Sequence, residues 1–458
     1  VGITPAHSQI DWDIAYRHAL QSDKIVINEY AKMQVQGRLA GLKATEAREK
    51  VVEWLKEESL LEKEEDITQN IATAERTGAA IEPLPKLQWW VDVGRPFALA
   101  HSSIPGIAAG AEITLKALMR QAVESGAVAM PQDGFRNAYF HWIDNLRDWC
   151  ISRQIWFGHR IPVWYRGEEI SVGNAPHGED WTQDEDVLDT WFSSALWSFS
   201  TLGWPEPTHD LATYHPTSFM SPGYEILNLW VSRMILMSGF HLGQVPFKTV
   251  LIHGLVRAKD GRKFSKSQGN GVDPLEIIDK YGADALRMGL LMGTAIGNDI
   301  KFDEQKVKGA KHFANKLWNI ARFVLEANTE PHGKEGGARF NDLEHDFKSR
   351  EREIFEQFRA LAKDVTDDME NYRLYLASEK LYHYLWHELA DKILEESKPI
   401  LSGADEAARA KRAKLLLVLL TDALKLLHPF MPFVTEEIWQ SLPTKNCDLL
   451  LVARWPII

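Results

Sequence analysis

The spacing of apolar residues changes near residue 306, and this change constrains the fold more than any other feature of the chain. Residues 86–305 alternate short apolar runs with helical stretches, and Gly and Pro punctuate the gaps. Such alternation predicts α/β architecture with a parallel sheet. From residue 306 apolar residues recur at spacings of three and four, which predicts a helix bundle. The expected helices span residues 306–325, 351–371, 374–396 and 406–427.

Local patterns predict further elements. Strands are expected within residues 87–93, 249–256 and 186–196, and a loop is expected at 330–337. Near the start, residues 45–65 carry apolar side chains at helical spacing, so we expect an amphipathic helix with Thr45 as its N-cap.

Charge is distributed unevenly along the chain. The net charge of the 458 residues is −12, which taken alone argues against a nucleic-acid-binding protein. Residues 306–458 are close to neutral, however, with 23 Lys and Arg against 24 Asp and Glu. Local basic clusters therefore remain available for RNA, although such clusters are also common on solvated helix faces. They comprise Lys306, Lys308, Lys311 and Lys316, and Lys411, Arg412 and Lys414.

Several classes of protein are excluded or disfavoured by composition. No apolar run reaches the roughly 18 residues that a membrane span needs. The only cysteines, Cys150 and Cys447, are far apart and support neither a disulfide framework nor a thiolate zinc site. The expected compartment is the cytosol. Because the first residue is Val1 and not Met, we expect the chain to begin inside a longer protein.

A lysine-rich loop follows the expected strand at 249–256. It contains Lys263 and Lys266, three residues apart, together with Ser265, Ser267 and two glycines. Lysines on a glycine-containing loop can neutralise the charge of a leaving pyrophosphate, and serine hydroxyls can donate to phosphate oxygens. The alternative for an isolated Lys-x-x-Lys pair is an exposed basic turn.

The sequence around this loop resembles a known family. Lys263-Phe-Ser-Lys-Ser267 is similar to the KMSKS signature of class I aminoacyl-tRNA synthetases, with Phe264 in place of Met, and Tyr281-Gly-Ala-Asp-Ala-Leu-Arg287 continues the likeness. Asn270-Gly271 stands where the family usually has Asn-Val. The resemblance implies the second half of a Rossmann-type catalytic domain, followed by an all-α anticodon-binding helix bundle. It also implies ATP-dependent activation of an amino acid, with Lys263, Lys266 and Ser265 as catalytic residues.

Upstream motifs narrow the resemblance to the valyl group. Asp186-Val-Leu-Asp-Thr-Trp-Phe-Ser-Ser-Ala-Leu-Trp197 and Thr201-Leu-Gly-Trp-Pro205 are typical of that group, and the isoleucyl group is the alternative. Trp191 and Trp230 match positions that wall the valine side-chain pocket, and rigid apolar walls suit a small branched substrate. The implied partners are valine, ATP with Mg²⁺ and the tRNA for valine. We expect a monomer without zinc.

The same resemblance assigns residues to the nucleotide. Gly223 and Glu225 match the site for the adenosine ribose, although the family usually has Asp where Glu225 stands. His253, Gly254 and Leu255 match the strand end that contacts adenine. In the expected helix at 306–325, Trp318, Asn319 and Arg322 are candidates for anticodon contacts.

Residues 1–85 are expected to be the end of an editing domain. An apolar pocket separates valine from threonine only about a hundredfold, so editing at a second site is the expected remedy. Thr4-Pro-Ala-His7 and Asp11 resemble the editing motif, with Ser8 in place of its Asp; an ordinary turn is the alternative. The division that follows is 1–85 editing, 86–305 catalytic and 306–458 anticodon-binding.

Two features of the family have no counterpart in this sequence. The histidine signature, His-Ile-Gly-His or a near variant, and the C-terminal coiled coil are absent, so we expect a C-terminal half with an incomplete catalytic site. A non-catalytic tRNA-binding fragment is therefore the competing hypothesis. A nicotinamide dehydrogenase is excluded because no Gly-x-Gly-x-x-Gly follows a strand.

Overall fold

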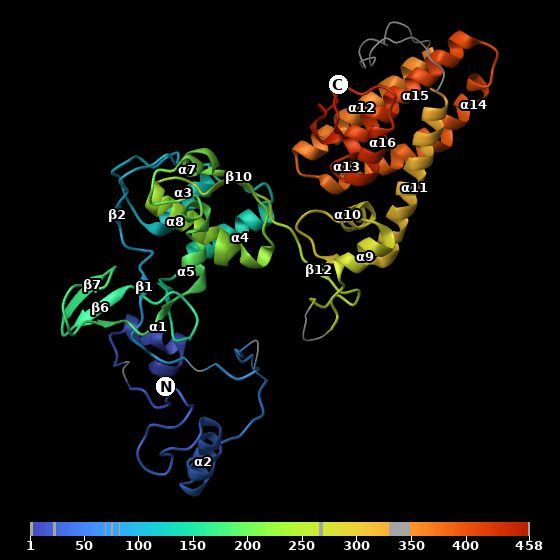
Figure 1. Cartoon of the computed structure of the whole chain (residues 1–458). Helices are drawn as coiled ribbons and strands as arrows, with labels where there is room; N and C mark the ends of the chain where they lie inside the picture. The colour runs from blue at the N-terminus through green and yellow to red at the C-terminus, as the bar shows by residue number, and fades with distance from the viewer. Residues whose placement is uncertain are drawn as a thin grey trace. The chain divides into compact units, whose positions relative to one another are not determined.

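The computed structural model describes residues 3–21, 24–68, 70–74, 77–81, 83–264, 269–328 and 349–456 (Figure 1). The chain forms two compact units. The first contains Val1–Val91 and Asp148–Asp189, and the second contains Asp92–Arg147 and Thr190–Ile458. The sequence predicts a division of the chain by function, at residues 85 and 305. The two compact units do not test that division, which stays a prediction.

The described residues of the first unit form short helices and three small antiparallel sheets. The sheets pair β1 with β4, pair β5 with β9, and order three strands as β7-β6-β8. The elements of this unit are η1 (Pro5–His7), α1 (Gln9–Arg17), α2 (Ala44–Glu57), β1 (Trp90–Val91), β4 (Trp149–Cys150), β5 (Ser152–Arg153), β6 (Val163–Arg166), β7 (Glu169–Val172), β8 (Thr182–Gln183) and β9 (Val187–Leu188).

Helix α2 corrects the prediction for residues 45–65. Its N-cap is Lys43 and not Thr45, because Glu46 in the first turn accepts from the Lys43 backbone N–H at 3.3 Å and so supplies the cap interaction from inside the helix. The helix also ends earlier than expected. Ser59 adopts a left-handed backbone with φ of 58°, which interrupts the helical path before the acidic stretch that follows.

The α/β part of the second unit contains a small parallel sheet. β10 and β11 pair in parallel with Thr217 opposite Phe247, and parallel bridges add Ala129 beside Thr249 and Gly223 beside His253. The elements are β2 (Phe97–Ala98), β3 (Glu112–Ile113), α3 (Leu115–Glu124), α4 (Asp133–Asp144), α5 (Thr190–Ser194), α6 (Trp197–Ser200), α7 (His209–Tyr214), β10 (Thr217–Met220), η2 (Tyr224–Ile226), the π-helix η3 (Leu227–Val231), α8 (Ser232–Leu242), β11 (Phe247–Val250), β12 (Val256–Arg257), α9 (Pro274–Tyr281), α10 (Ala283–Leu291) and β13 (Ile300–Lys301).

The predicted strands of this region are shorter in the structure than in the sequence analysis. Residues 249–256 supply the end of β11 and the start of β12, and between the two strands the chain keeps the single bridge of His253 to Gly223. Within 186–196 only Val187–Leu188 is a strand, since α5 begins at Thr190. Residues 87–93 contain β1 alone. Parallel strands flanked by helices confirm the predicted α/β class.

The rest of the second unit is a helix bundle, drawn from gold through orange to red in Figure 1. All four predicted helices are confirmed, and the third is longer than expected and contains a π-helical middle. The loop predicted at 330–337 lies outside the described residues. The elements are α11 (Glu304–Glu326), α12 (Ser349–Glu370), α13 (Leu374–His383), the π-helix η7 (Tyr384–Leu394), α14 (Glu395–Leu401), α15 (Glu406–Leu427), α16 (Pro432–Gln440) and η8 (Leu450–Val452).

Helix α15 forms the centre of the bundle. Leucines cover so much of its surface that most residues after Lys411 are buried, and α11, α12, α14 and α16 pack around it. A helix that is apolar on nearly all sides must be surrounded by others, and this accounts for its central place. Among the described residues, no helix combines the length and the apolar character needed to cross a membrane.

One residue of the expected basic clusters is not at the surface. Arg412 is 1% exposed, and its guanidinium donates to Glu351 Oε1 at 2.9 Å and to Glu396 Oε1 at 3.4 Å. It therefore ties α15 to α12 and α14, and its proposed place in an RNA-binding patch is wrong. Periodicity alone could not show this, because Lys411 and Lys414 on either side are exposed.

Candidate nucleotide and amino-acid site

The lysine loop begins as a hairpin at the end of β12. Ala258 N–H donates to Arg262 O at 2.9 Å, Gly261 adopts a positive φ of 86° at the turn, and Arg257 bridges Lys263 in antiparallel fashion. The hairpin places Lys263 back beside the strand end. Ser265 and Lys266 lie outside the described residues.

Lys263 contacts a residue that the sequence assigns to the ribose. Its Nζ lies 2.9 Å from Glu225 Oε1, and both side chains are substantially exposed. The Asn270 side chain donates to Lys263 O at 3.1 Å and holds the outgoing arm of the loop. The structure thus brings together two predicted site residues that 38 positions separate.

The remaining nucleotide residues lie on two adjoining segments. His253 N–H donates to Pro222 O at 3.0 Å, which sets His253 beside Gly223. A Cβ on Gly254 would stand 2.0 Å from Asn298 O, so only glycine allows the two backbones to approach this closely. Gly223, Glu225, His253, Gly254 and Leu255 therefore form one continuous edge of the molecule, which is continued by Lys263.

Asp299 is a prominent member of this edge that sequence reasoning missed. Its carboxylate accepts from Leu255 N–H at 2.9 Å and from the Tyr224 hydroxyl at 3.2 Å, and it is paired with Arg257. The Leu255 N–H and the Arg257 guanidinium together lower the pKa of Asp299 below its usual value. In the sequence, Asp299 is an acidic residue between Gly297 and the short strand that begins at Ile300. This pattern is too common to mark Asp299 as a site residue.

The two predicted pocket tryptophans stand on neighbouring elements. Trp191 lies in α5 and Trp230 in η3, and these elements contact each other. Trp230 Nε1 donates to Ser194 O at 3.0 Å, and its ring meets that of Trp197 edge-on with centroids 5.9 Å apart. Both Trp191 and Trp230 are half-buried. The hydrogen bond fixes the orientation of the Trp230 ring, as a rigid pocket wall requires.

The three residues predicted for editing form a cluster in the first unit. Asp11 Oδ2 accepts from Thr4 N–H at 2.8 Å and from its hydroxyl at 3.2 Å, and His7 Nε2 accepts from Val26 N–H at 3.0 Å. Ser8 caps α1 by accepting from Asp11 N–H. These contacts account for the fold of the turn, so the editing assignment stays a prediction.

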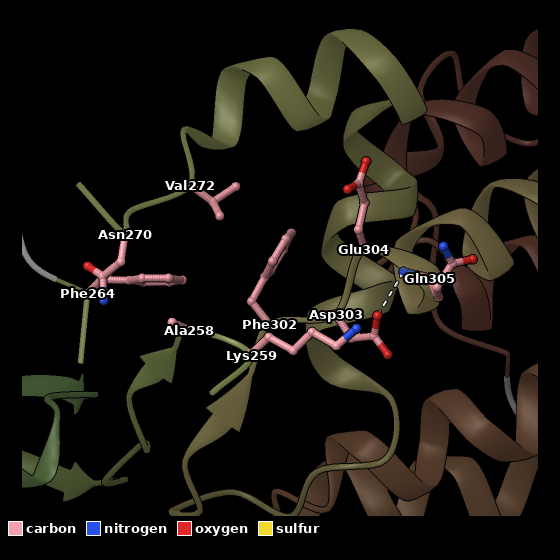
Figure 2. Close-up of a pocket in the computed structure, with 9 residues that line it drawn as sticks. All are labelled: Ala258, Lys259, Phe264, Asn270, Val272, Phe302, Asp303, Glu304 and Gln305. Carbon is pink, nitrogen blue, oxygen red and sulfur yellow. Dashed lines mark hydrogen bonds between the residues drawn. The ribbon is translucent and has the colours of Figure 1, made fainter. Parts of the chain in front are cut away.

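A cavity of about 310 Å³ lies against the hairpin (Figure 2). Phe264, Val272 and Phe302 contribute apolar side chains to it, and Lys259 and Asp303 contribute charge. Of the residues predicted for the nucleotide, those that the structure describes do not line this cavity. Glu225 and His253 of the predicted nucleotide edge are exposed.

Comparison with known families decides what kind of protein carries this edge. Residues 6–177 and 173–303 match the family described as tRNA synthetases class I (I, L, M and V), and residues 351–457 match the anticodon-binding domain of tRNA ligase. The chain belongs to the class I tRNA synthetases. The second match agrees with the helix bundle predicted from the sequence.

Two relatives that are similar in sequence over the whole chain are both valine–tRNA ligases. The chain is 42% identical over 466 residues to the valine–tRNA ligase of Clostridium tetani, and 43% identical over 462 residues to that of Oceanobacillus iheyensis. Each alignment covers 100% of the chain and 50% of the relative. The chain thus spans about half the length of these curated relatives.

Solved structures show the same class I synthetase fold at lower identity. The methionyl-tRNA synthetase of Mycobacterium tuberculosis bound by methionyl-adenylate is similar with a TM-score of 0.57 and 20% identity, covering 72% of this chain and 62% of that one. The LeuRS of Agrobacterium radiobacter, in a ternary complex with tRNA, has a TM-score of 0.51 and 20% identity, covering 71% and 46%. These likenesses support the fold and not a substrate.

Proposed function

We propose that the protein containing this chain joins valine to its tRNA through a valyl-adenylate, with ATP as its Mg²⁺ complex. The observation that carries the proposal is the edge at which Lys263 meets Glu225, next to Gly223 and the His253–Leu255 strand end. This edge offers a cation suited to phosphates, a carboxylate suited to ribose hydroxyls and backbone groups suited to a base, which supports the proposal.

The first step proposed is an in-line displacement at phosphorus. A carboxylate oxygen of valine attacks the α-phosphate, the bond to the β-phosphate breaks, and pyrophosphate leaves. Lys263 and Lys266 neutralise the charge that grows on the leaving group. A terminal hydroxyl of the tRNA then attacks the valyl carbonyl, and AMP leaves.

Access of ATP requires Lys263 to exchange partners. The side chains of Lys263 and Glu225 are 60% and 43% exposed, so water screens their ion pair and its contribution is at most about 1 kcal/mol. The bound nucleotide can therefore replace this contact, with ribose hydroxyls donating to Glu225 and phosphate oxygens accepting from Lys263. Glu225 is one methylene longer than the usual Asp, and its contact with Lys263 supports its proposed role beside the phosphate-binding lysine.

We assign the remaining predicted residues on the same basis. Trp191 and Trp230 would wall the valine pocket, and Thr4, His7 and Asp11 would belong to a site that hydrolyses threonine attached to the tRNA. A monomeric protein of the cytoplasm, without zinc, is part of the proposal. The competing function, a tRNA-binding fragment without catalysis, is favoured for the isolated chain by its match to half the length of its relatives.

The decisive experiment is valine-dependent ATP–pyrophosphate exchange in the longest natural protein that contains this sequence. We expect exchange with valine, and a loss of two or more orders of magnitude for Lys263→Ala or Lys266→Ala, since one such donor contributes about 3–4 kcal/mol. The Michaelis constant for valine should change little. Lys259→Ala is the matched control, because this lysine lies on the same hairpin but lines the cavity of Figure 2.

Two results would overturn the proposal. Exchange that falls less than about fivefold in both lysine variants would remove the loop from the site, since a lost transition-state donor costs far more. Exchange that depends on isoleucine in preference to valine would move the protein to the isoleucyl group.

A further inference from the structure

The backbone around the predicted adenine-contacting residues is held by side chains as well as by backbone partners. Between β11 and β12, Leu251 N–H donates to Met220 O at 2.9 Å and His253 N–H donates to Pro222 O at 3.0 Å. Side chains bind the backbone groups of the residues between and after them. The Gln132 side chain donates to Ile252 O at 2.7 Å and accepts from Ile252 N–H at 2.8 Å. Asp299 accepts from Leu255 N–H at 2.9 Å. These two side chains hold His253 and Gly254 from either end.

Asp299 also reaches the turn that carries the predicted ribose carboxylate. Tyr224 directly precedes Glu225, and its hydroxyl lies 3.2 Å from Asp299 Oδ2 and 2.9 Å from Arg257 Nη2. Arg257 in turn bridges Lys263, the first lysine of the loop. One carboxylate is therefore linked to three segments: the strand end, the ribose turn and the root of the lysine loop.

The surroundings of Asp299 partly shield this arrangement from water. The Asp299 and Arg257 side chains are only 29% and 27% exposed, which is drier than the Lys263–Glu225 pair. The missing Cβ of Gly254 lets residues 298 and 299 pack directly on the strand end. A carboxylate in such a place fixes its partners more firmly than a pair at the open surface.

We infer that Asp299 is a positioning residue for ATP, which sets the spacing between the adenine, ribose and phosphate contacts by holding Leu255, Tyr224 and Arg257. This inference rests on the proposed function for the identity of the ligand. Asp299 itself touches none of the reacting atoms. Asp299 holds the binding residues in place before ATP arrives. Without it, ATP would have to order these residues as it binds.

Variants of Asp299 separate its charge from its hydrogen bonds. Asp299→Ala removes every contact. Asp299→Asn keeps an acceptor for Leu255 N–H but loses the charge that faces Arg257, and Tyr224→Phe removes only the hydroxyl bridge. The matched control is Asp184→Asn in the first unit, because Asp184 likewise accepts from a tyrosine hydroxyl, at 2.8 Å, and from a backbone N–H, at 2.9 Å.

The test measures ATP and valine binding by calorimetry, together with thermal unfolding and valine-dependent exchange, in the longest natural protein. We expect the dissociation constant for ATP to rise about tenfold or more in Asp299→Ala and by smaller factors in Asp299→Asn and Tyr224→Phe, since a misplaced contact can cost up to about a hundredfold. Valine binding should stay within about twofold. Asp184→Asn should lower the unfolding temperature and leave ATP binding unchanged.

The outcomes distinguish this inference from the proposed function. ATP binding within about twofold of wild type in Asp299→Ala, or an equal loss of ATP and valine binding, overturns the positioning role. Normal ATP binding by the wild type without valine-dependent exchange overturns the proposed function alone. A wild type that binds no ATP overturns both.

Discussion

Trp230 shows how a single residue acquires a role from its neighbours. It belongs to a chain with 17 tryptophans, most of which the sequence treats as candidates for the core. The structure orients its ring by the hydrogen bond to Ser194 O and by the edge contact with Trp197. A half-buried ring that is fixed on one side can present its other face to a small ligand, which agrees with a place in the valine pocket.

Replacing Trp230 with leucine should relax this pocket. Removal of the ring admits one more methylene, an increment of about 1–3 kcal/mol, so activation of isoleucine should rise relative to valine by roughly 10- to 200-fold. The two exchange rates, measured side by side, give this ratio. Trp204→Leu is the control, since Trp204 packs on Phe199 and His241 and should change stability only. An unchanged ratio in folded Trp230→Leu would assign Trp230 to the core.

At the scale of the element, charged residues join helices that are distant in sequence. Buried Arg412 of α15 holds Glu351 of α12 and Glu396 of α14, and Arg350 also binds Glu396, at 2.8 Å. At the other end of the bundle, buried Asp284 of α10 accepts from the backbone N–H groups of Phe433 and Val434 and caps α16. Such contacts select one packing of the helices, which apolar stripes alone leave less defined.

The Glu396 contacts predict a pH dependence of stability. The hydrogen bond that Glu396 accepts from Arg350 is the main reason that the pKa of Glu396 lies below its ordinary value of 4.5. A lowered folded pKa means that the contribution to stability is present above the unfolded value and is lost as the pH falls through the folded value. Glu396→Gln should therefore melt below wild type at pH 7, and the difference should shrink toward pH 3.

The size of this effect and its control follow from exposure. The Glu396 side chain is 35% exposed, so solvent screening limits the difference at pH 7 to about 1 kcal/mol, or about 2–4 °C. Glu395→Gln is the control, because within the described part of the chain Glu395 pairs with its neighbour Lys398 at an exposed site. Circular dichroism at a series of pH values measures both variants, and equal differences at pH 3 and pH 7 would contradict the assignment.

At the scale of the whole molecule, the chain combines an acidic α/β part with a bundle that is nearly neutral in sequence. Any RNA contact must therefore use local surfaces, because the net charge does not favour it. Trp318, Asn319 and Arg322 all lie on the exposed face of α11, and the Trp318 side chain is 44% exposed. An exposed tryptophan next to an arginine can stack an unpaired base and contact its phosphate.

We expect this chain to bind the tRNA for valine, with an affinity that falls steeply as salt rises because phosphate contacts release counterions. Trp318→Ala combined with Arg322→Ala should weaken binding by roughly tenfold, since one stacked base contributes about 1–3 kcal/mol. Filter binding at several salt concentrations measures both effects. The control is Trp54→Ala, which removes an equally exposed tryptophan of α2. Equal binding of a tRNA with a swapped anticodon would refute the role of the bundle.

Residue order alone determined the α/β class and the helices of the bundle and predicted the role of the lysine loop, because helical periodicity and signature motifs are local properties of the chain. Only the tertiary structure decided which of these residues meet. Lys263 contacts Glu225 across 38 positions, Arg412 is buried although its neighbours are exposed, and Asp299 reaches back 75 positions to Tyr224. Each depends on how separate elements pack. A sequence pattern shows whether a residue is apolar or charged, but it does not show which distant residues it contacts. The partners of these three charged residues are therefore known only from the fold.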